Sequence, residues 1–182
     1  MDTLQHICED FRRKIELAHE KGAFVDDVTF KHFPKGCCGL TCYLLSEYLL
    51  EYKAKTIYVW GTYSGQSHAW LVLKDKCVAT PTRKYNLIPD SYKTFLQSYG
   101  QEVYDEPFVT INYKYEDIKD GLIIDITADQ FGQSPVYLGP LDSFHRKFSF
   151  CSAHDCLGVS VDNGGYVDNM LKYLYGIITT IT

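Results

Sequence analysis

Apolar residues recur at helical spacing in two stretches of the first third of the chain. In residues 3–21 they fall on one helical face with charged residues between them, and Gly22 follows where the helix would end. In residues 38–52 a second apolar stripe begins at Cys38, just after Gly36. The pattern predicts two amphipathic helices, the second with a cysteine in its first turn.

Runs of β-branched and aromatic residues follow, and they predict strands. The runs cover residues 56–60, 67–73, 108–115, 121–126 and 136–138. Turn residues at 61–66 would join the first two strands into a hairpin. Weaker patterns predict a short helix at 91–99 and a closing helix at 166–178. We therefore expect an α+β fold in which helices precede an antiparallel sheet.

Composition excludes several classes of function. The chain has 182 residues, of which 46% are hydrophobic and 23% charged, as in an ordinary globular protein. The formal net charge of -5 argues against a nucleic-acid partner, because Lys and Arg are not in excess. No apolar stretch reaches the length of a membrane-spanning helix, so we expect no membrane partner. No Gly-rich phosphate loop or nucleotide motif is visible, so we expect no organic cofactor.

The seven cysteines do not follow a disulfide pattern, since their number is odd and their spacing irregular. Residues 1–7 lack the basic segment and apolar run that open a signal peptide. We therefore expect a cytoplasmic protein with free thiols, and an effector secreted without an ordinary signal stays open.

Cys38 is the sharpest candidate for chemistry because it lies where the second helix is predicted to begin. A thiol becomes a good nucleophile only when it is ionised. The free N–H groups and the dipole of a helix N-terminus stabilise an anion, and they can also bind the oxyanion that forms when a thiolate attacks a carbonyl. The plainer interpretation is a small buried residue at the start of a core helix.

His68 and Asp125 are polar residues in otherwise apolar strands. By alternation, His68 shares a strand face with Trp70 and Val72. A carboxylate inside an apolar strand costs free energy unless it is paired. If the two strands are neighbours, Asp125 accepts the imidazole N–H and orients the ring, and His68 serves as the base of the thiol. The alternatives are a structural histidine at a strand end and a carboxylate that caps a turn.

This set of residues resembles the papain-like superfamily in its transglutaminase-like branch. In that branch the Cys opens a helix after Gly-x, the His heads a strand and is often followed two residues later by Trp, and the Asp precedes x-Thr. The matching segments are Gly36-Cys37-Cys38, His68-Ala69-Trp70 and Ile124-Asp125-Ile126-Thr127. The chain also looks like a little-described bacterial group with the phrases FPxGCCG, SHAWL and GLIIDITADQF. The resemblance covers roughly a third of the chain.

The resemblance implies a papain-like/transglutaminase-like fold in one domain, residues 1–182, with the nucleophile helix packed on an antiparallel sheet. The stretch between His68 and Asp125 is long for such a fold, which indicates an insertion at about 76–116. Such enzymes often place a polar side chain shortly before the Cys to help bind the oxyanion.

The candidates for oxyanion or substrate binding are His32, Gln66 and Trp70, with Lys31 beside His32. The Gly-x-Cys spacing and the Gly that follows favour Cys38 over Cys37 as the nucleophile.

We therefore predict a thiol hydrolase with the catalytic triad Cys38, His68 and Asp125, most simply a peptidase or isopeptidase acting on a protein or peptide substrate through a thioester. A glutamine deamidase, a transglutaminase or an acyltransferase would use the same triad. His145 is the fallback base.

Two alternatives come from other classes. One is a structural zinc site drawn from Cys37, Cys38, Cys42 and His68, with further ligands in residues 151–156. The adjacent cysteines do not suit the usual ligand spacing, so we expect no metal. The other alternative is a non-catalytic binding module, in which Cys38 would react like an ordinary thiol.

Overall fold

Seven strands form one antiparallel sheet in the part of the chain that the computed structural model describes, residues 2–76, 82–86, 108–156, 158 and 166–182. The strands are β1 (Thr56–Tyr63), β2 (Gln66–Leu73), β3 (Thr82–Asn86), β4 (Phe108–Tyr113), β5 (Ile123–Asp125), β6 (Tyr137–Gly139) and β7 (Ser149–Cys156). Their order in the sheet is β3-β4-β7-β1-β2-β5-β6. This confirms the predicted α+β class with an antiparallel sheet.

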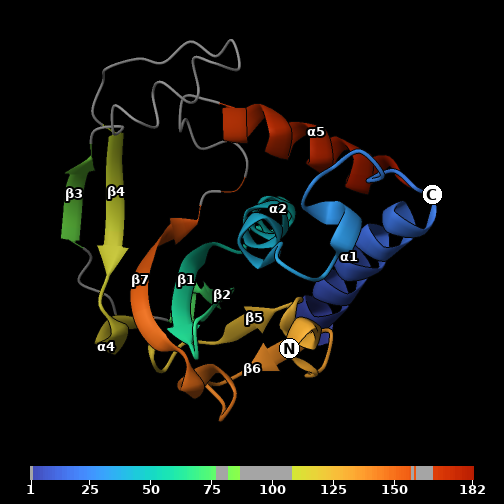
Figure 1. Cartoon of the computed structure of the whole chain (residues 1–182). Coiled ribbons are helices and arrows are strands. Elements are labelled where there is room, and N and C mark those ends of the chain that lie inside the picture. Colours follow the sequence, from blue (N-terminus) through green and yellow to red (C-terminus); the bar gives the residue numbers. More distant parts are fainter. Residues whose placement is uncertain (1, 77–81, 87–107, 157, 159–165) are drawn as a thin grey trace.

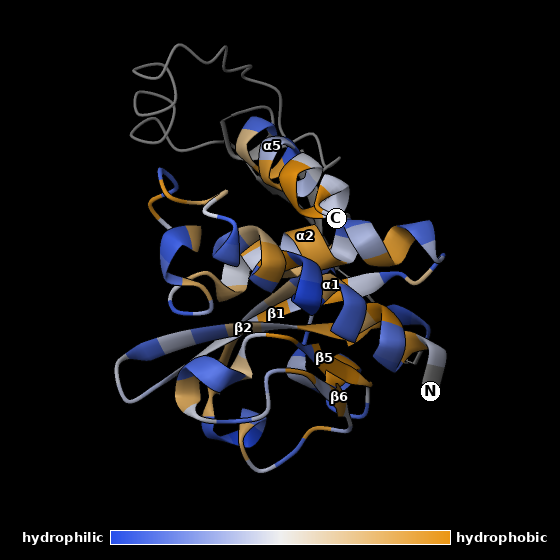
Figure 2. Ribbon diagram, turned by 90° about the vertical axis from the view of Figure 1, so that its right-hand side faces the viewer, coloured by the Kyte–Doolittle hydropathy of each residue, from blue (hydrophilic) through white to orange (hydrophobic). Residues whose placement is uncertain are grey.

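Three long helices lie on one side of the sheet (Figures 1 and 2). They are α1 (Asp2–Glu20), α2 (Cys38–Glu51) and α5 (Tyr166–Thr180), close to the helices that the sequence predicts. Their apolar faces share a buried core with Leu71 of β2 and Ile124 of β5. Ser46 ties α2 to the sheet, because its hydroxyl donates to the carbonyl of Cys156 at 2.9 Å and accepts from Thr56 at 2.9 Å.

The opposite face of the sheet is covered by loops and short helical turns rather than long helices. The short elements of the described chain are η1 (Phe30–His32), η2 (Lys74–Lys76), α4 (Tyr115–Ile118), η3 (Ala128–Phe131) and η4 (His145–Lys147). Of these, η1 lies on the helix side, where Phe30 packs in the first core. Trp70, Val72 and Ile123 pack in a second buried core with Phe144 and Phe148 on this face. The sheet therefore separates two cores.

The predicted hairpin of β1 and β2 forms, but its turn is tighter than the sequence indicated. The strands pair from Thr56↔Leu73 to Tyr63↔Gln66, so Gly61 lies within β1 instead of the turn. A Cβ at Gly61 would approach the carbonyl oxygen of Ser149 to 2.7 Å, so β7 packs where no side chain fits. Gly61 is also the cross-strand partner of His68.

The sequence did not predict β3 and β7, and both lie in the half of the sheet that also contains β4. β7 lies between β1 and β4, and β3 pairs with β4 at the edge. β3 and β4 both come from the stretch predicted as an insertion. The helix predicted at 91–99 lies outside the described residues. Among the described residues, no helix is long and apolar enough to cross a bilayer.

Candidate active site

Cys38 is the first residue of α2, as the apolar pattern predicted. The N-cap residue Cys37 makes no side-chain capping hydrogen bond, and the first turn of the helix contains no acidic residue. The free N–H groups and the positive end of the helix dipole therefore lack a carboxylate partner within α2. An ionised Cys38 thiol supplies the missing negative charge.

The sulfur of Cys38 lies beside an open stretch of β2. β5 pairs with β2 at only two positions, Leu71 and Val72. The backbone N–H of Ala69 is therefore free of that ladder, and it donates to the Cys38 sulfur together with the N–H of Gly39. The short β5 thus leaves room for the tip of α2 at the edge of β2.

His68 and Asp125 form a buried pair next to this sulfur. His68 Nε2 lies 2.7 Å from Asp125 Oδ2, and the two residues are 0% and 2% exposed. The other imidazole nitrogen, Nδ1, is the one left to interact with the Cys38 thiol. Asp125 Oδ1 accepts from the Thr127 backbone N–H at 2.8 Å and from its hydroxyl at 3.1 Å. The structure thus brings the three predicted residues together around the His68 imidazole.

Aromatic rings fix the orientation of the His68 imidazole. Its ring centroid lies 5.0 Å from that of Phe131, 5.3 Å from Phe148 and 5.7 Å from Phe144. Rings on several sides limit the rotation of the imidazole and exclude water from it. Water exclusion strengthens the hydrogen bond to Asp125.

The electrostatics favour a thiolate–imidazolium pair. Burial raises the pKa of the Cys38 thiol, but the hydrogen bond and positive charge of His68 outweigh burial, so this pKa is lowered. Burial lowers the pKa of His68, but its hydrogen bonds to Asp125 and Cys38 outweigh burial and raise this pKa to about 9. Burial raises the pKa of Asp125, and hydrogen bonds from the two neighbouring histidines lower it more. All three directions favour the charged forms of Cys38, His68 and Asp125.

The adjacent Cys37 has the opposite character. It is 1% exposed, and its thiol donates to the carbonyl of Pro34 at 3.1 Å. Burial raises the pKa of Cys37 to about 12. Cys38 is partly exposed and hydrogen-bonded to His68, so the geometry favours Cys38, as the Gly-x-Cys spacing indicated.

His145 is a second buried histidine on the same carboxylate. Its Nε2 lies 3.2 Å from Asp125 Oδ2, and its Nδ1 lies 2.7 Å from Asp142 Oδ1. The sequence suggested His145 as a fallback base, but the structure places it behind Asp125, where it extends the hydrogen-bond chain away from the thiol.

Arg12 fixes the loop that follows β5. Its guanidinium donates to both carboxylate oxygens of Asp129, at 2.9 and 2.7 Å, and to the carbonyl of Ile126 at 2.6 Å. Asp129 is therefore paired with Arg12 of α1 rather than with His68. No local pattern pointed to Arg12, because its partners lie more than a hundred residues away.

Gln130 is a further polar residue that sequence reasoning missed. Its Nε2 donates to the carbonyl of Thr127 at 3.0 Å and lies 3.5 Å from His68 Nδ1. Its Oε1 accepts from the N–H of Gly36 at 3.3 Å. Gln130 therefore links the histidine to the loop that leads into Cys38.

Of the three residues suggested for oxyanion or substrate binding, His32 and Gln66 form no hydrogen bond to the triad within the described chain, whereas Trp70 lies beside His68. His32 is exposed in η1, and Gln66 is exposed at the start of β2. No hydrogen bond of the described residues joins either side chain to Cys38 or His68. Trp70 is buried on the His68 face of β2, as the alternation indicated, with its ring 5.8 Å from the imidazole.

One group of side chains in the described chain has the spacing that a metal ion needs. It consists of His68, Asp125 and His145, whose ligand atoms lie within 4.8 Å of one another. The hydrogen bonds of the triad already account for this closeness. Among the described residues, no group that contains a cysteine meets that spacing, so the zinc arrangement around Cys37, Cys38 and Cys42 does not form there.

Comparison of the chain with protein-family models, curated proteins and solved structures gives no match. The functional interpretation therefore depends on the geometry of the site.

Proposed function

We propose that this chain is a cysteine-dependent acyl-transfer enzyme with a papain-like/transglutaminase-like fold, and that it acts as a peptidase or isopeptidase. One observation carries the proposal. A partly exposed thiol at a helix N-terminus interacts with a buried histidine, whose Nε2 is 2.7 Å from a buried carboxylate. A nucleophile, a base and a group that orients the base are the parts that covalent acyl transfer requires.

In the proposed reaction the Cys38 thiolate attacks the amide carbonyl carbon, and the π electrons move to the oxygen. As the tetrahedral intermediate collapses, the C–N bond breaks and His68 Nδ1 gives its proton to the leaving amine. A thioester on Cys38 remains. Water then attacks the thioester and gives a proton to His68. The C–S bond breaks, the acid leaves, and the thiolate–imidazolium pair is restored.

The oxyanion needs two donors near the sulfur. The backbone N–H of Cys38 at the start of α2 is the first. For the second we propose the side-chain amide of Gln130 in place of His32 and Gln66. One amide hydrogen of Gln130 is used by the carbonyl of Thr127. When His68 Nδ1 is protonated it cannot accept the other hydrogen, which is then free for the oxyanion.

A peptide that carries an electrophilic vinyl sulfone tests the proposal. We expect fast covalent labelling, mapped by peptide mass spectrometry to Cys38, and its loss in Cys38→Ala with the fold intact by circular dichroism. Cys151→Ala is the matched control, because Cys151 is exposed and lies outside the triad. Labelling that follows Cys151, or equal labelling of all exposed thiols, would overturn the proposal.

The acyl acceptor is tested separately with an ester, p-nitrophenyl acetate. With a peptidase mechanism, acetate is released at the same rate in the presence or absence of a primary amine. If the amine instead collects most of the acetyl group, the chain is a transglutaminase or acyltransferase on the same triad. Deamidation of a glutamine peptide distinguishes the third possibility.

A further inference from the structure

A pocket of about 270 Å³ lies on the face of the sheet opposite the three long helices. Its floor is formed by buried apolar side chains of the central strands: Val59, Val72 and Ile123. Cys38 is not among its lining residues, but His145 forms part of its wall. The pocket is therefore distinct from the thiol and lies behind the triad.

The apolar lining would accept a body of limited size. A cavity of roughly 150 Å³ holds benzene, so this pocket fits a body of about ten carbon atoms. Typical ligand sites combine such an apolar surface with a few polar groups that fix orientation.

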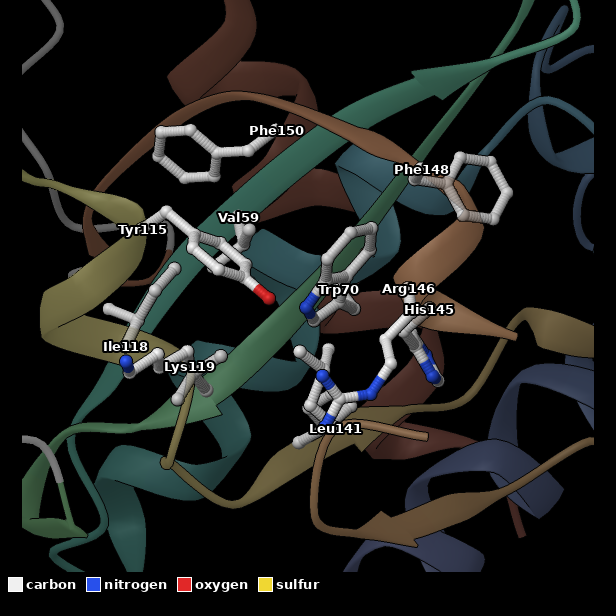
Figure 3. A pocket seen from close by; sticks show the side chains of 12 residues that line it. Val59, Trp70, Tyr115, Ile118, Lys119, Leu141, His145, Arg146, Phe148 and Phe150 are labelled. Atoms are coloured by element: carbon white, nitrogen blue, oxygen red, sulfur yellow. The ribbon is translucent and has the colours of Figure 1, made fainter. Parts of the chain in front are cut away.

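Three polar groups point into the pocket from three elements (Figure 3). They are the hydroxyl of Tyr115 in α4, the indole nitrogen of Trp70 in β2 and the guanidinium of Arg146 in η4. Trp70 is 5% exposed, yet among the described residues its N–H has no hydrogen-bond acceptor. The indole nitrogen is not among the buried, unsatisfied side-chain atoms of the described residues, so this N–H is open to the cavity, where a ligand can accept from it.

Arg146 supplies the charge at the mouth of the pocket. In the described part of the chain its guanidinium forms no ion pair, whereas Lys119 on the other side of the mouth is paired with Glu116 at 2.6 Å. The guanidinium and the indole N–H both have donors that are free for a ligand, and the two oxygens of a carboxylate can accept from each.

We propose that this pocket binds a small carboxylic acid with an apolar body, which places its carboxylate between Arg146 and Trp70 and its body on the strand floor. The site does not depend on the proposed catalytic function, so binding is measured on Cys38→Ala as well as on the natural chain. Either conclusion can then fail without the other.

Isothermal titration calorimetry with 1-naphthoate and octanoate tests the proposal, and it also separates aromatic from aliphatic acids. The uncharged amides of the same two bodies are the controls. We expect one of the acids to bind at least ten times more tightly than its amide. Arg146→Gln should remove the preference for the acid over the amide. Trp70→Phe keeps an aromatic ring but loses the N–H, so it should reduce the affinity for the acid.

Lys147→Gln is the matched control variant, because Lys147 is the next residue in η4, is exposed and does not line the pocket. It should leave both affinities unchanged. The proposal is overturned if neither acid binds or if acid and amide bind equally. It is also overturned if Lys147→Gln lowers the affinity for the acid as much as Arg146→Gln does.

Discussion

The two sides of Asp125 hold the same kind of side chain in different surroundings. His68 and His145 are both buried, and both place Nε2 near Asp125 Oδ2, at 2.7 and 3.2 Å. Beyond His68 lies the partly exposed thiol of Cys38, whereas beyond His145 lies the carboxylate of Asp142.

The group beyond each ring decides what that histidine can do. A thiol can exchange a proton with His68, and it lies where a substrate can reach it. The ring nitrogens of His145 both contact carboxylates, and neither faces a nucleophile. We therefore expect His68 to act in the reaction and His145 to position Asp125. Changes on the two sides should affect activity very differently.

The largest effect is expected from His68→Ala. Without the imidazole, nothing ionises the thiol or protonates the leaving group, so hydrolysis of p-nitrophenyl acetate should fall by at least about 1,000-fold. Circular dichroism and the thermal midpoint check that the fold survives. Turnover within a few-fold of the natural chain would remove His68 from the mechanism.

Asp125→Asn should have the next largest effect. Both carboxylate oxygens of Asp125 accept two hydrogen bonds, from the histidines on Oδ2 and from Thr127 on Oδ1. An amide has a single acceptor oxygen, so its NH2 must face N–H donors at one end. We expect steady-state turnover to fall by roughly 100-fold to 10,000-fold. An unchanged rate would show that the orientation of His68 does not depend on this carboxylate.

His145→Gln tests the other side of the comparison. Gln keeps one donor toward Asp125 but loses the link to Asp142. Because the proton transfer itself is untouched, we expect a loss of only about 10-fold, mainly in kcat, as for residues that support a catalytic group. Asp142→Asn should resemble it. If His145→Gln were as damaging as His68→Ala, the assigned roles of the two histidines would be wrong.

Arg12→Ala should affect stability more than chemistry. It leaves Asp129 and the carbonyl of Ile126 without their partner, and loss of one member of a largely buried pair costs about 3 kcal/mol. Urea denaturation measures this free energy of unfolding. Glu16→Ala is the control, because Glu16 pairs with the same Arg12 at a more exposed position. If both variants lose the same free energy of unfolding, the contact of Arg12 with Asp129 and Ile126 has no special role in stability.

The sequence predicted the long helices, the hairpin and the three residues of the triad because these depend on local periodicity and residue type. Cys38 could be placed at a helix start, and His68 and Asp125 stood out as polar residues in apolar strands. β7 was missed because its sequence, Ser149–Cys156, is polar and rich in Cys and His, which suggested metal ligands instead of a strand.

Arg12, Gln130 and the positioning role of His145 were not predicted because their contacts are long-range. The pairs Arg12–Asp129 and Gln130–His68 join residues far apart in the chain. No pattern within one segment reports such a pair. His32 and Gln66 were suggested for oxyanion binding because they lie near Cys38 or His68 in the sequence. In the fold it is Gln130 that lies near His68.

The most direct test of the central claim is the rate of iodoacetamide alkylation at each cysteine as a function of pH, resolved by mass spectrometry. Because the pKa of Cys38 is lowered, its thiolate should persist below the range of ordinary thiols, and at pH 6 it should react at least about ten times faster than the exposed Cys151. His68→Gln should abolish this advantage. If Cys38 reacts no faster than Cys151 at pH 6, or keeps its rate in His68→Gln, the thiolate–imidazolium pair does not exist.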